Sequence, residues 1–568
     1  MATPRPMTST RLSDALYALR RVMVYVLLFS FVLNLLSLLL PIYSLQVFDR
    51  VITSHSLDTL FGLTLVVLVG YGFFGIIFTL RASVIARVLE WLEARLTPEL
   101  LTTAIRSASE ARLPSAAEPL RELQTIRNFI AAPLPMLMDI PFALLFLLVI
   151  TLLQPVLGVM TLLGMLLIAA AALANEYATR LPLRQATRHQ VESLLNADRM
   201  GAQAEAIEAM GMRDAVLKHW EHAYQAGLTS QELAQSRSAM LQGFSRSLRL
   251  ILQLAVIGVG AWLTINQQLS PGGLVAASIL VARALGPFEN VLFLYKQMTL
   301  TRDAYSRLQR FLMNAPMPRG ETALPKPNGG IEVAGLSYTP PGHPTILRGV
   351  SFRLAPGESL GIIGPAAAGK STLAKCLVGV LPPTQGLVRL DGADVYHWSR
   401  ADFGLHVGYL PQSVELFPGT LKQNIARMQT DASDEAVTKA AQRAGVHELI
   451  LSFKDAYDTV YVPGQSVLSP GQKQRIGLAR ALFGEVRLVV LDEPNSNLDS
   501  DGERALIQAI STLKRDGVTL VIIAHRPSIM RSVDTILMLR GGQVEAIGAR
   551  DTIIARYTPG KPTGGRDV

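Results

Sequence analysis

Apolar residues in the first half of the chain gather into six runs. A transmembrane helix needs about 20 predominantly apolar residues, because the hydrocarbon core of a bilayer is roughly 30 Å thick. The runs match this length, although the fifth is diluted by Gln253. The pattern therefore predicts six membrane spans, which lie near Val22–Tyr43, Thr59–Leu80, Leu134–Leu153, Val156–Ala174, Leu250–Ile265 and Gly273–Leu294.

After Tyr295 the pattern changes to short β-rich stretches separated by glycine and proline. A proline-rich segment, 315–330, is typical of a linker. The sequence therefore predicts a transmembrane domain over residues 1–314 and a second domain over residues 331–568.

Two long polar segments separate spans two and three and spans four and five, at residues 81–133 and 175–249. Both are rich in Ala, Leu, Glu, Arg and Gln, which favour helix. We expect extended cytoplasmic helices there. The segments Glu118–Phe129 and Glu205–Val216, each midway between two spans, are candidates for transverse helices that touch a cytoplasmic domain, with solvated helices of no special task as the alternative.

The basic residues orient the spans. The same two segments hold seven arginines and nine Arg or Lys, respectively, whereas the three short loops on the other side hold only Arg50. Positively charged loops stay in the cytoplasm, so both termini and both long segments are expected there. The first span is too long for a cleaved signal peptide and lacks a cleavage site.

Composition supports a membrane protein with a soluble part. Of the 568 residues, 49% are hydrophobic and 17% are charged, and the mean hydropathy is +0.31. Soluble domains carry about 25% charged residues, so a purely soluble or disordered chain is excluded. The net charge of +9 does not indicate nucleic acid, and the single cysteine, Cys376, excludes an internal disulfide.

A phosphate-binding loop is predicted at Gly364–Ser371, between an apolar strand at Ser359–Ile363 and an apolar-periodic helix. This is the G-x-x-x-x-G-K-[ST] pattern in its required strand–loop–helix setting. Its backbone N–H groups and the helix N-terminus attract phosphate. Lys370 would reach the β- and γ-phosphates, and the Ser371 hydroxyl would ligate Mg²⁺.

A second continuous apolar strand, Leu488–Asp492, ends in two acids. Such a strand belongs in a parallel sheet that is covered on both faces. Asp492 can hold Mg²⁺, and Glu493 is placed to polarise an attacking water. A solvated acidic pair at a strand end is the alternative, which the phosphate loop makes less favourable.

At this point the sequence resembles the ABC transporter family, over residues 328–556. Leu468–Gln472 looks like the ABC signature motif, twenty residues ahead of Asp492. Four further elements follow the family order: Gln412 resembles the Q-loop, Ser496–Asp499 the D-loop, His525 the switch histidine, and Tyr338 the aromatic residue that stacks on adenine.

The resemblance implies a fold: a six-span membrane α-helical bundle of the type I/IV ABC exporter class, joined to an α/β P-loop NTPase domain. It also implies a homodimer in which each ATP lies between one phosphate loop and the other copy's signature motif, with Mg²⁺ as cofactor. Catalysis is then expected from Glu493, His525 and Gln412, and metal ligation from Ser371, Gln412 and Asp492. The implied nucleotide contacts are Tyr338, Gly364, Pro365, Ala366, Ala367, Ala368, Gly369, Lys370, Ser371, Thr372, Ser469, Gly471, Gln472 and Asp499.

The chain departs from the family pattern at three places. Ala366 stands where many relatives carry a polar residue, and Pro470 replaces the first glycine of the signature pair, which removes one N–H. Val462–Gln465 lacks the acidic residue of the usual coupling loop, which puts that coupling contact in doubt. The hydrolytic residues are all present, so we expect an active ATPase.

Charged residues inside spans are costly and tend to face a bundle interior or an aqueous path. Asp139 lies in the third run, and Arg283 and Glu289 lie in the sixth, flanking Gly286–Pro287, a step that can kink the helix. For these three residues, snorkelling or pairing within the bundle is weighed equally with lining a translocation path.

Over nearly its full length the chain resembles the type I secretion exporters, especially the protease- and haemophore-exporting branch. The similar segments include residues 119–149, 204–220 and 490–499. The resemblance implies export of an unfolded polypeptide with an uncleaved C-terminal signal across a Gram-negative inner membrane, with a periplasmic adaptor and an outer-membrane channel as partners. Only about 21 residues precede the first span, so no leader peptidase domain is expected.

Two alternatives remain open at this level. One is an exporter of lipid, drug or small peptide with the same motor, and the other is an ATP-binding channel regulator that does not hydrolyse ATP. The presence of Glu493 and His525 argues against the second.

Overall fold

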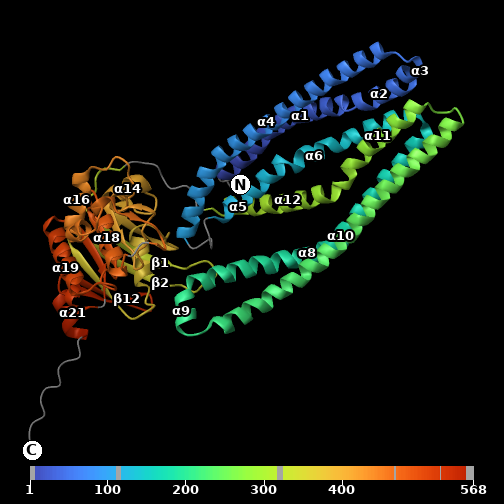
Figure 1. Ribbon diagram of the computed structural model, residues 1–568. Helices are drawn as coiled ribbons and strands as arrows, with labels where there is room; N and C mark the ends of the chain where they lie inside the picture. Colours follow the sequence, from blue (N-terminus) through green and yellow to red (C-terminus); the bar gives the residue numbers. More distant parts are fainter. Residues whose placement is uncertain (1–6, 111–116, 316–323, 466–467, 525, 558–568) are drawn as a thin grey trace, which may run out of the picture. The chain divides into compact units, whose positions relative to one another are not determined.

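The computed structural model describes residues 7–110, 117–315, 324–465, 468–524 and 526–557 (Figure 1). The chain divides into two compact units, Met1–Ile105 with Ser115–Ala315, and Arg106–Pro114 with Pro316–Val568. The predicted linker, 315–330, starts at this division. The domain bounds proposed from the sequence stay a prediction.

The described part of the first unit is built from helices. Six segments are long and apolar enough to cross a membrane, and each contains one of the six predicted runs, which confirms the six-span prediction. The elements are α1 (Met7–Leu36), α2 (Leu39–Gln46), a π-helical turn (Val47–Val51), α3 (Ile52–Ser54), α4 (Leu57–Ser109), α5 (Glu118–Ala131), α6 (Pro133–Asp139), a 3₁₀ turn (Ile140–Phe142), α7 (Ala143–Leu153), α8 (Pro155–Ala202), α9 (Ala204–Ala209), α10 (Arg213–Ile265), α11 (Pro271–Glu289) and α12 (Val291–Met313).

Prolines interrupt the spans. The sixth span is broken rather than merely kinked: α11 contains Pro287 and ends two residues later, and α12 begins at Val291. The third span changes from α6 to α7 through the turn that contains Pro141. A proline inside a helix lacks the N–H for the i−4 bond and clashes with that carbonyl, so it favours such breaks.

The described residues of the two long polar segments are mostly helical, as predicted, and their cytoplasmic location stays a prediction. Helices α8 and α10, of 48 and 53 residues, run side by side and are joined through α9 (Figure 1). At 1.5 Å per residue they are roughly 70–80 Å long, well beyond the thickness of a membrane. Near their far ends the indole N–H of Trp220 donates to the carbonyl of Ser193 at 3.1 Å. The two candidate transverse segments correspond to α5 and to the stretch from α9 into the start of α10.

Helix α5 belongs to the interior of the first unit. Its Leu123, Ile126 and Ile130 are buried in an apolar cluster that also takes residues from α1, α4 and α12. On its polar face Glu122 accepts two hydrogen bonds from the Arg307 guanidinium of α12, at 2.7 and 2.8 Å.

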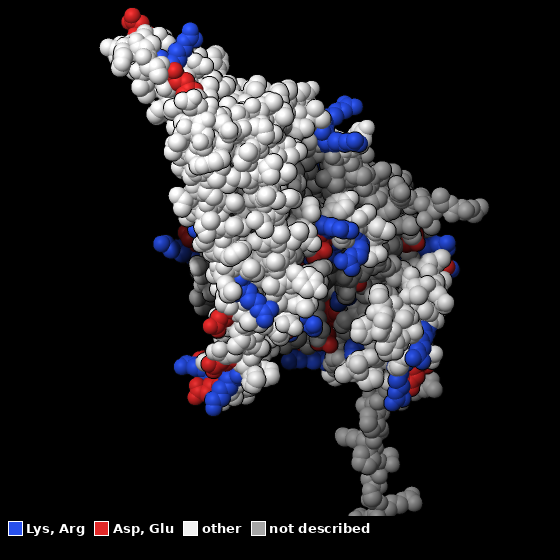
Figure 2. All heavy atoms as spheres, turned by 90° about the vertical axis from the view of Figure 1, so that its right-hand side faces the viewer, with Lys and Arg blue, Asp and Glu red and all other residues white. Residues whose placement is uncertain are grey.

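The outer surface of the first unit is apolar. Figure 2 shows a broad face on which charged side chains gather toward the two ends and leave an uncharged zone between them. Large apolar side chains of the spans are exposed, including Leu68 at 64%, Phe73 at 57% and Leu163 at 54%. Exposed apolar area of this extent marks an interaction surface, and lipid is the partner expected for membrane spans.

The second unit contains a six-stranded sheet in the order β12-β11-β3-β10-β9-β6, with a separate four-stranded sheet, β2-β1-β4-β5, and a two-stranded ribbon, β7-β8. The strands from β11 to β6 are parallel, and β12 is antiparallel. Their bounds are β1 (Ile331–Tyr338), β2 (Leu347–Leu354), β3 (Ser359–Ile363), β4 (Gln385–Leu390), β5 (Ala393–Asp394), β6 (Val407–Leu410), β7 (Gly419–Thr420), β8 (Val460–Tyr461), β9 (Leu488–Asp492), β10 (Thr519–Ile523), β11 (Thr535–Arg540) and β12 (Gln543–Ala549).

Helices cover both faces of the six-stranded sheet, so β9 and β10 are fully buried, as their continuous apolar sequences predict. The helices are α13 (Lys370–Leu377), α14 (Arg400–His406), α15 (Leu421–Ile425), α16 (Asp434–Arg443), α17 (His447–Leu451), a 3₁₀ turn (Ala456–Asp458), α18 (Pro470–Ala481), α19 (Ser500–Arg515), α20 (Pro527–Met530) and α21 (Arg550–Tyr557).

The only cysteine of the sequence, Cys376, lies on α13 and faces this core. Its side chain is fully buried. Burial raises the pKa of its thiol to about 12.

The segment Arg106–Pro114, which follows the second span in the sequence, also belongs to the second unit. Of this segment, residues 106–110 are described. Within the unit the Tyr396 hydroxyl donates to a carboxylate oxygen of Glu110 at 2.7 Å, and Glu110 is only 2% exposed. Glu110, the first residue after α4, is therefore held by a buried polar contact.

Candidate nucleotide site

The parallel sheet brings the predicted motifs to one edge. Strands β3, β10, β9 and β6 are neighbours and run in the same direction, so their carboxyl ends share this edge. The phosphate loop follows β3, Asp492 and Glu493 end β9, and Gln412 follows β6 by two residues. Ligands of open α/β sheets bind at this edge.

The phosphate loop is shaped by close backbone approaches. A Cβ on Gly364 would lie 2.1 Å from the Leu539 carbonyl oxygen, so only glycine fits there. Gly369, which immediately precedes α13, has a φ of +97°. Ala367 has a φ of +61°, which is unfavourable for a residue with a Cβ. Strain of this kind gathers at ligand-binding loops.

Lys370 lies across the loop. Its side chain is 7% exposed, and its ammonium donates to the carbonyls of Gly364 and Pro365 at 3.0 and 2.9 Å. The cation is thus held where the loop closes, as the phosphate-loop prediction requires. Of the other predicted loop contacts, Pro365 and Ala366 are exposed, Ala368 is buried, and Thr372 is half-buried on α13.

Two of the three predicted metal ligands are in contact. The Ser371 hydroxyl donates to the Asp492 carboxylate at 3.2 Å. Asp492 is 1% exposed, and burial is the main reason why its pKa is raised, opposed by the Ser371 bond and by two nearby lysines. A hydroxyl and a carboxylate are hard oxygen donors of the kind that suits Mg²⁺.

Glu493 has an unusual backbone and a defined partner. Its φ is +50°, in the left-handed region, and its N–H donates to the Ile523 carbonyl at 2.9 Å. Its carboxylate accepts from the Gln412 amide, also at 2.9 Å. The predicted base and the predicted Q-loop residue are therefore in direct contact. His525 lies outside the described residues.

The signature motif begins α18. The Ser469 hydroxyl accepts from the Gln472 N–H at 3.2 Å, and the Gln472 side chain accepts from the Ser469 N–H at 2.9 Å, which is a capping box. Pro470 occupies the first helical position, where the missing N–H has no intrahelical partner anyway. A Cβ on Gly471 would lie 2.5 Å from the Asn497 carbonyl oxygen, so this glycine is required.

Two of the predicted nucleotide contacts have structural partners. Asp499 caps α19, where its carboxylate accepts from the Gly502 N–H at 2.8 Å. Tyr338 is 7% exposed within the apolar cluster around the phosphate-loop strand. Adenine stacking by Tyr338 and nucleotide contact by Asp499 stay predictions.

The sequence reasoning missed Gln474. This side chain is 2% exposed, donates to the Glu493 carbonyl at 3.1 Å and accepts from the Asn497 N–H at 3.1 Å. It links the signature helix to the loop between β9 and α19. The sequence does contain a signal for this role. Gln474 is a polar residue on the same face of α18 as Gly477, Leu478 and Ala481, which are buried.

The three charged residues predicted for the translocation path lie in different surroundings. Asp139 accepts from the Arg81 guanidinium at 3.2 and 3.3 Å, and Arg81 also donates to Ser30 at 2.9 Å. This is pairing within the bundle. Arg283 is exposed on α11, and the side chain of Glu289 lies outside the described side chains.

Two protein family models match this chain. Residues 347–496 match the ABC transporter family, and residues 23–288 match the ABC transporter transmembrane region. The chain belongs to the ABC transporter family. It is an exporter with a transmembrane part and a cytoplasmic ATP-hydrolysing part, which confirms the fold class and the enzyme class expected from the sequence.

Its relatives include secretion proteins. The chain is 35% identical to the type I secretion system ATP-binding protein PrsD of Rhizobium meliloti, over 93% of this chain and 91% of the relative. It is 30% identical to the cyclolysin secretion/processing ATP-binding protein CyaB of Bordetella pertussis, over 95% and 77%. The resemblance to type I secretion exporters is thereby confirmed.

Among solved structures, a bacterial Atm1-family ABC exporter with ATP bound matches with a TM-score of 0.79 and 21% identity, over 95% of this chain and 97% of the other. At this identity the match supports the fold alone.

Proposed function

We propose that this ABC transporter is the motor of a type I secretion system, which uses ATP to export an unfolded polypeptide with an uncleaved C-terminal signal. The observation that carries the proposal is the similarity to PrsD over nearly the whole of both chains, and the contacts of Ser371 with Asp492 and of Gln412 with Glu493 support it. A lipid, drug or small-peptide exporter is the alternative that the test below must separate.

The residues of the site support hydrolysis. Lys370 and the backbone of the phosphate loop bind the β- and γ-phosphates. Glu493 accepts the proton of the attacking water, because its carboxylate is fixed at the sheet edge by the Gln412 amide 2.9 Å away. Ser371, Asp492 and Gln412 would hold Mg²⁺, which would neutralise charge on the phosphates.

The cellular setting extends the same proposal. A homodimer would place Ser469 and Gly471 of one copy against the ATP of the other. The six spans would lie in a Gram-negative inner membrane, with a periplasmic adaptor and an outer-membrane channel as partners. The similarity to PrsD and CyaB, both secretion proteins by name, supports this setting.

Secretion of a reporter tests the proposal. A reporter fused to the C-terminal segment of a candidate secreted protein should reach the medium when transporter, adaptor and outer-membrane channel are present together. Glu493→Gln should abolish export, because it removes the base while keeping the shape of the side chain.

Two results would overturn the proposal. One is export that continues after the C-terminal segment is deleted. The other is a purified transporter in proteoliposomes that moves fluorescent lipid in an ATP-dependent way and whose ATPase rate ignores the C-terminal segment.

A further inference from the structure

The first unit contains a pocket of about 610 Å³ between α8, α10, α11 and α12. Its lining on α8 runs from Ile168 to Gln190, whereas the fourth span ends at Thr179. The pocket therefore begins beside residues of the fourth candidate span and extends beyond the end of that span. Its volume lies in the range of ligand sites, roughly 300–1,000 Å³.

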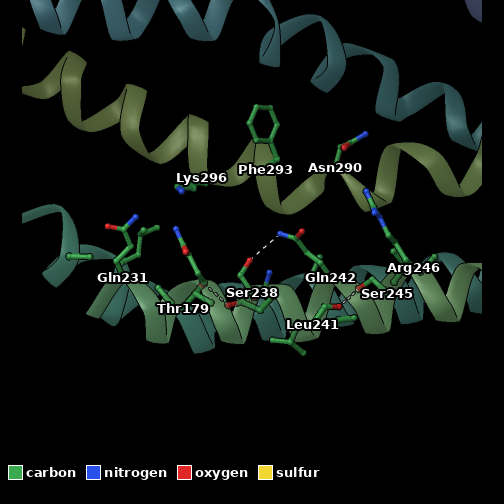
Figure 3. A pocket seen from close by; sticks show the side chains of 18 of the residues that line it. Thr179, Gln231, Ser238, Leu241, Gln242, Ser245, Arg246, Asn290, Phe293 and Lys296 are labelled. Carbon is green, nitrogen blue, oxygen red and sulfur yellow. Dashed lines mark hydrogen bonds between the residues drawn. The ribbon is translucent and has the colours of Figure 1, made fainter. Parts of the chain in front are cut away.

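A polar stripe on α10 lines this pocket. Gln231, Gln235, Ser238, Gln242 and Ser245 follow one another at intervals of four, three, four and three residues. Residues at this spacing share one face of a helix. Figure 3 shows Ser238 and Gln242 projecting from α10 toward α12, with a hydrogen bond of 3.0 Å between their side chains. A helix face that points into a bundle is usually apolar, whereas this face of α10 is polar.

Helix α8 contributes a second polar row, with Asn175, Thr179, Thr187 and Gln190. Asn175 is 2% exposed, and its side-chain oxygen has no hydrogen-bond partner within the described structure. Burying an acceptor without a partner is costly. A bound molecule with an N–H group would satisfy it. Small side chains, such as Ala171 and Ala234, leave room between the rows.

These side chains suit a peptide backbone. Each carboxamide offers two N–H donors and one acceptor oxygen, and the backbone of an extended chain carries one N–H and one C=O per residue. Thr179 and Ser245 donate to carbonyls of their own helices at 2.8 and 3.0 Å, so their oxygens remain acceptors. Recognition through such groups does not depend on the side chains of the ligand.

The charged groups of the lining are cationic. Arg246 and Lys296 are the charged residues among the described side chains that line the pocket, and neither forms an ion pair there. Figure 3 shows Arg246 projecting from α10 toward the α11–α12 connection. Unpaired cations in a polar cleft attract anions and repel cations.

Resting on the proposed function, we propose that this pocket binds an extended segment of the exported polypeptide through its backbone, and that Arg246 and Lys296 make it prefer acidic segments. The stripe from Gln231 to Arg246 covers about 22 Å of helix, which equals about seven residues of extended chain. The polar side chains of α8 and α10 bind a peptide backbone of any sequence, and Arg246 and Lys296 favour segments with acidic side chains.

Peptide binding to the full-length transporter in nanodiscs tests the pocket. The probes are fluorescent unstructured peptides of about eight residues, one rich in aspartate, one rich in lysine, and an aspartate-rich one with methylated backbone nitrogens. The aspartate peptide should bind best. Methylation should weaken its binding, because it removes the N–H donors while keeping the charge.

Variants assign the effect to the pocket. Gln235→Leu and Gln242→Leu keep the approximate volume and should each weaken binding by about fivefold, the effect of one hydrogen bond. Arg246→Gln should reduce the preference for aspartate over lysine. Gln225→Leu and Lys218→Gln, exposed on α10 outside the pocket, are the matched controls and should leave binding unchanged.

Three outcomes overturn the inference: equal binding of the methylated peptide, equal binding of the lysine peptide, or variants that behave like their controls. A reporter secretion assay on the same variants separates the two proposals. Normal signal-dependent export with unchanged peptide binding in Gln242→Leu rejects the pocket alone. Absence of both signal-dependent export and peptide binding in the unaltered transporter rejects the proposed function as well.

Discussion

The amide of Gln474 donates to the main-chain carbonyl of Glu493 at 3.1 Å, and so ties the signature helix to the catalytic strand end. Glu493 has a left-handed backbone with a φ of +50°. Such a conformation persists only when the surroundings hold it in place. Gln474 is thus placed to position Glu493, the proposed base, although it lies five residues after Ser469, in the middle of a helix.

Gln474→Met should lower the kcat of ATP hydrolysis with little change in the KM for ATP. The substitution preserves approximate volume but leaves the Asn497 N–H without its partner, a cost of about 1–3 kcal/mol for a buried group. It also removes one of the two hydrogen bonds to the Glu493 carbonyl, which keeps the bond from the Ser496 N–H. Steady-state kinetics of the purified transporter measure both constants. A raised KM with an unchanged kcat would show that Gln474 acts in binding instead.

Glu493→Gln should bind ATP normally and hydrolyse it roughly 10²–10⁴ times more slowly, because the amide cannot take a proton from water. Phosphate release measures the rate, and binding of labelled ATP measures the affinity. Glu485→Gln, at an exposed ion pair with Lys326, is the matched control and should keep the parental rate. A fast Glu493→Gln variant would move the role of base to another residue, with His525 as the first candidate.

Lys370→Ala should abolish tight ATP binding, because it removes the cation that faces the β- and γ-phosphates. The control is Lys375→Ala, which removes a lysine on the same helix that is exposed rather than buried. Equal nucleotide affinity in the two variants would contradict the assignment of the phosphate loop.

Asp492→Asn should stabilise the nucleotide-free transporter at neutral pH while it impairs hydrolysis. Burial raises the pKa of Asp492, so the charged form costs folding free energy at every pH above that raised value. The gain in Tm should shrink as the pH falls from the raised pKa toward the ordinary carboxyl pKa of about 4, and it should vanish below that value, where the acid is neutral in both states. Thermal unfolding as a function of pH measures this. A gain that does not depend on pH would contradict the electrostatic explanation.

Arg81→Gln should destabilise the first unit more than the double variant Arg81→Gln with Asp139→Asn. Removing one partner leaves an uncompensated charge, whereas removing both leaves two neutral groups. The Arg81–Asp139 pair is at 3.2 Å, with the Arg81 side chain 13% exposed. A double-mutant cycle on Tm measures the coupling, and additive effects would show that the pair contributes nothing.

The sequence was informative where structure is local. Six spans and the loop from Gly364 to Ser371 follow from apolar run length and glycine spacing, and each depends on neighbouring residues only. The partner of Asp139 is 58 positions away, and that of Gln474 is 19 positions away. Such contacts depend on how elements pack, which periodicity does not encode. For the same reason the sequence could not show that the polar faces of α8 and α10 line one pocket.

The buried thiol of Cys376 makes this transporter ready for site-specific labelling. Thiolate is the reactive species of cysteine, and with full burial and a pKa of about 12 this one is shielded from both maleimide and solvent. A cysteine introduced at an exposed position would therefore be the only reactive thiol in each copy of the chain. A spin label or fluorophore can be attached to the cysteine of a Gln242→Cys or Lys296→Cys variant without first removing the native cysteine. Passage of a polypeptide past either position can then be followed by spectroscopy.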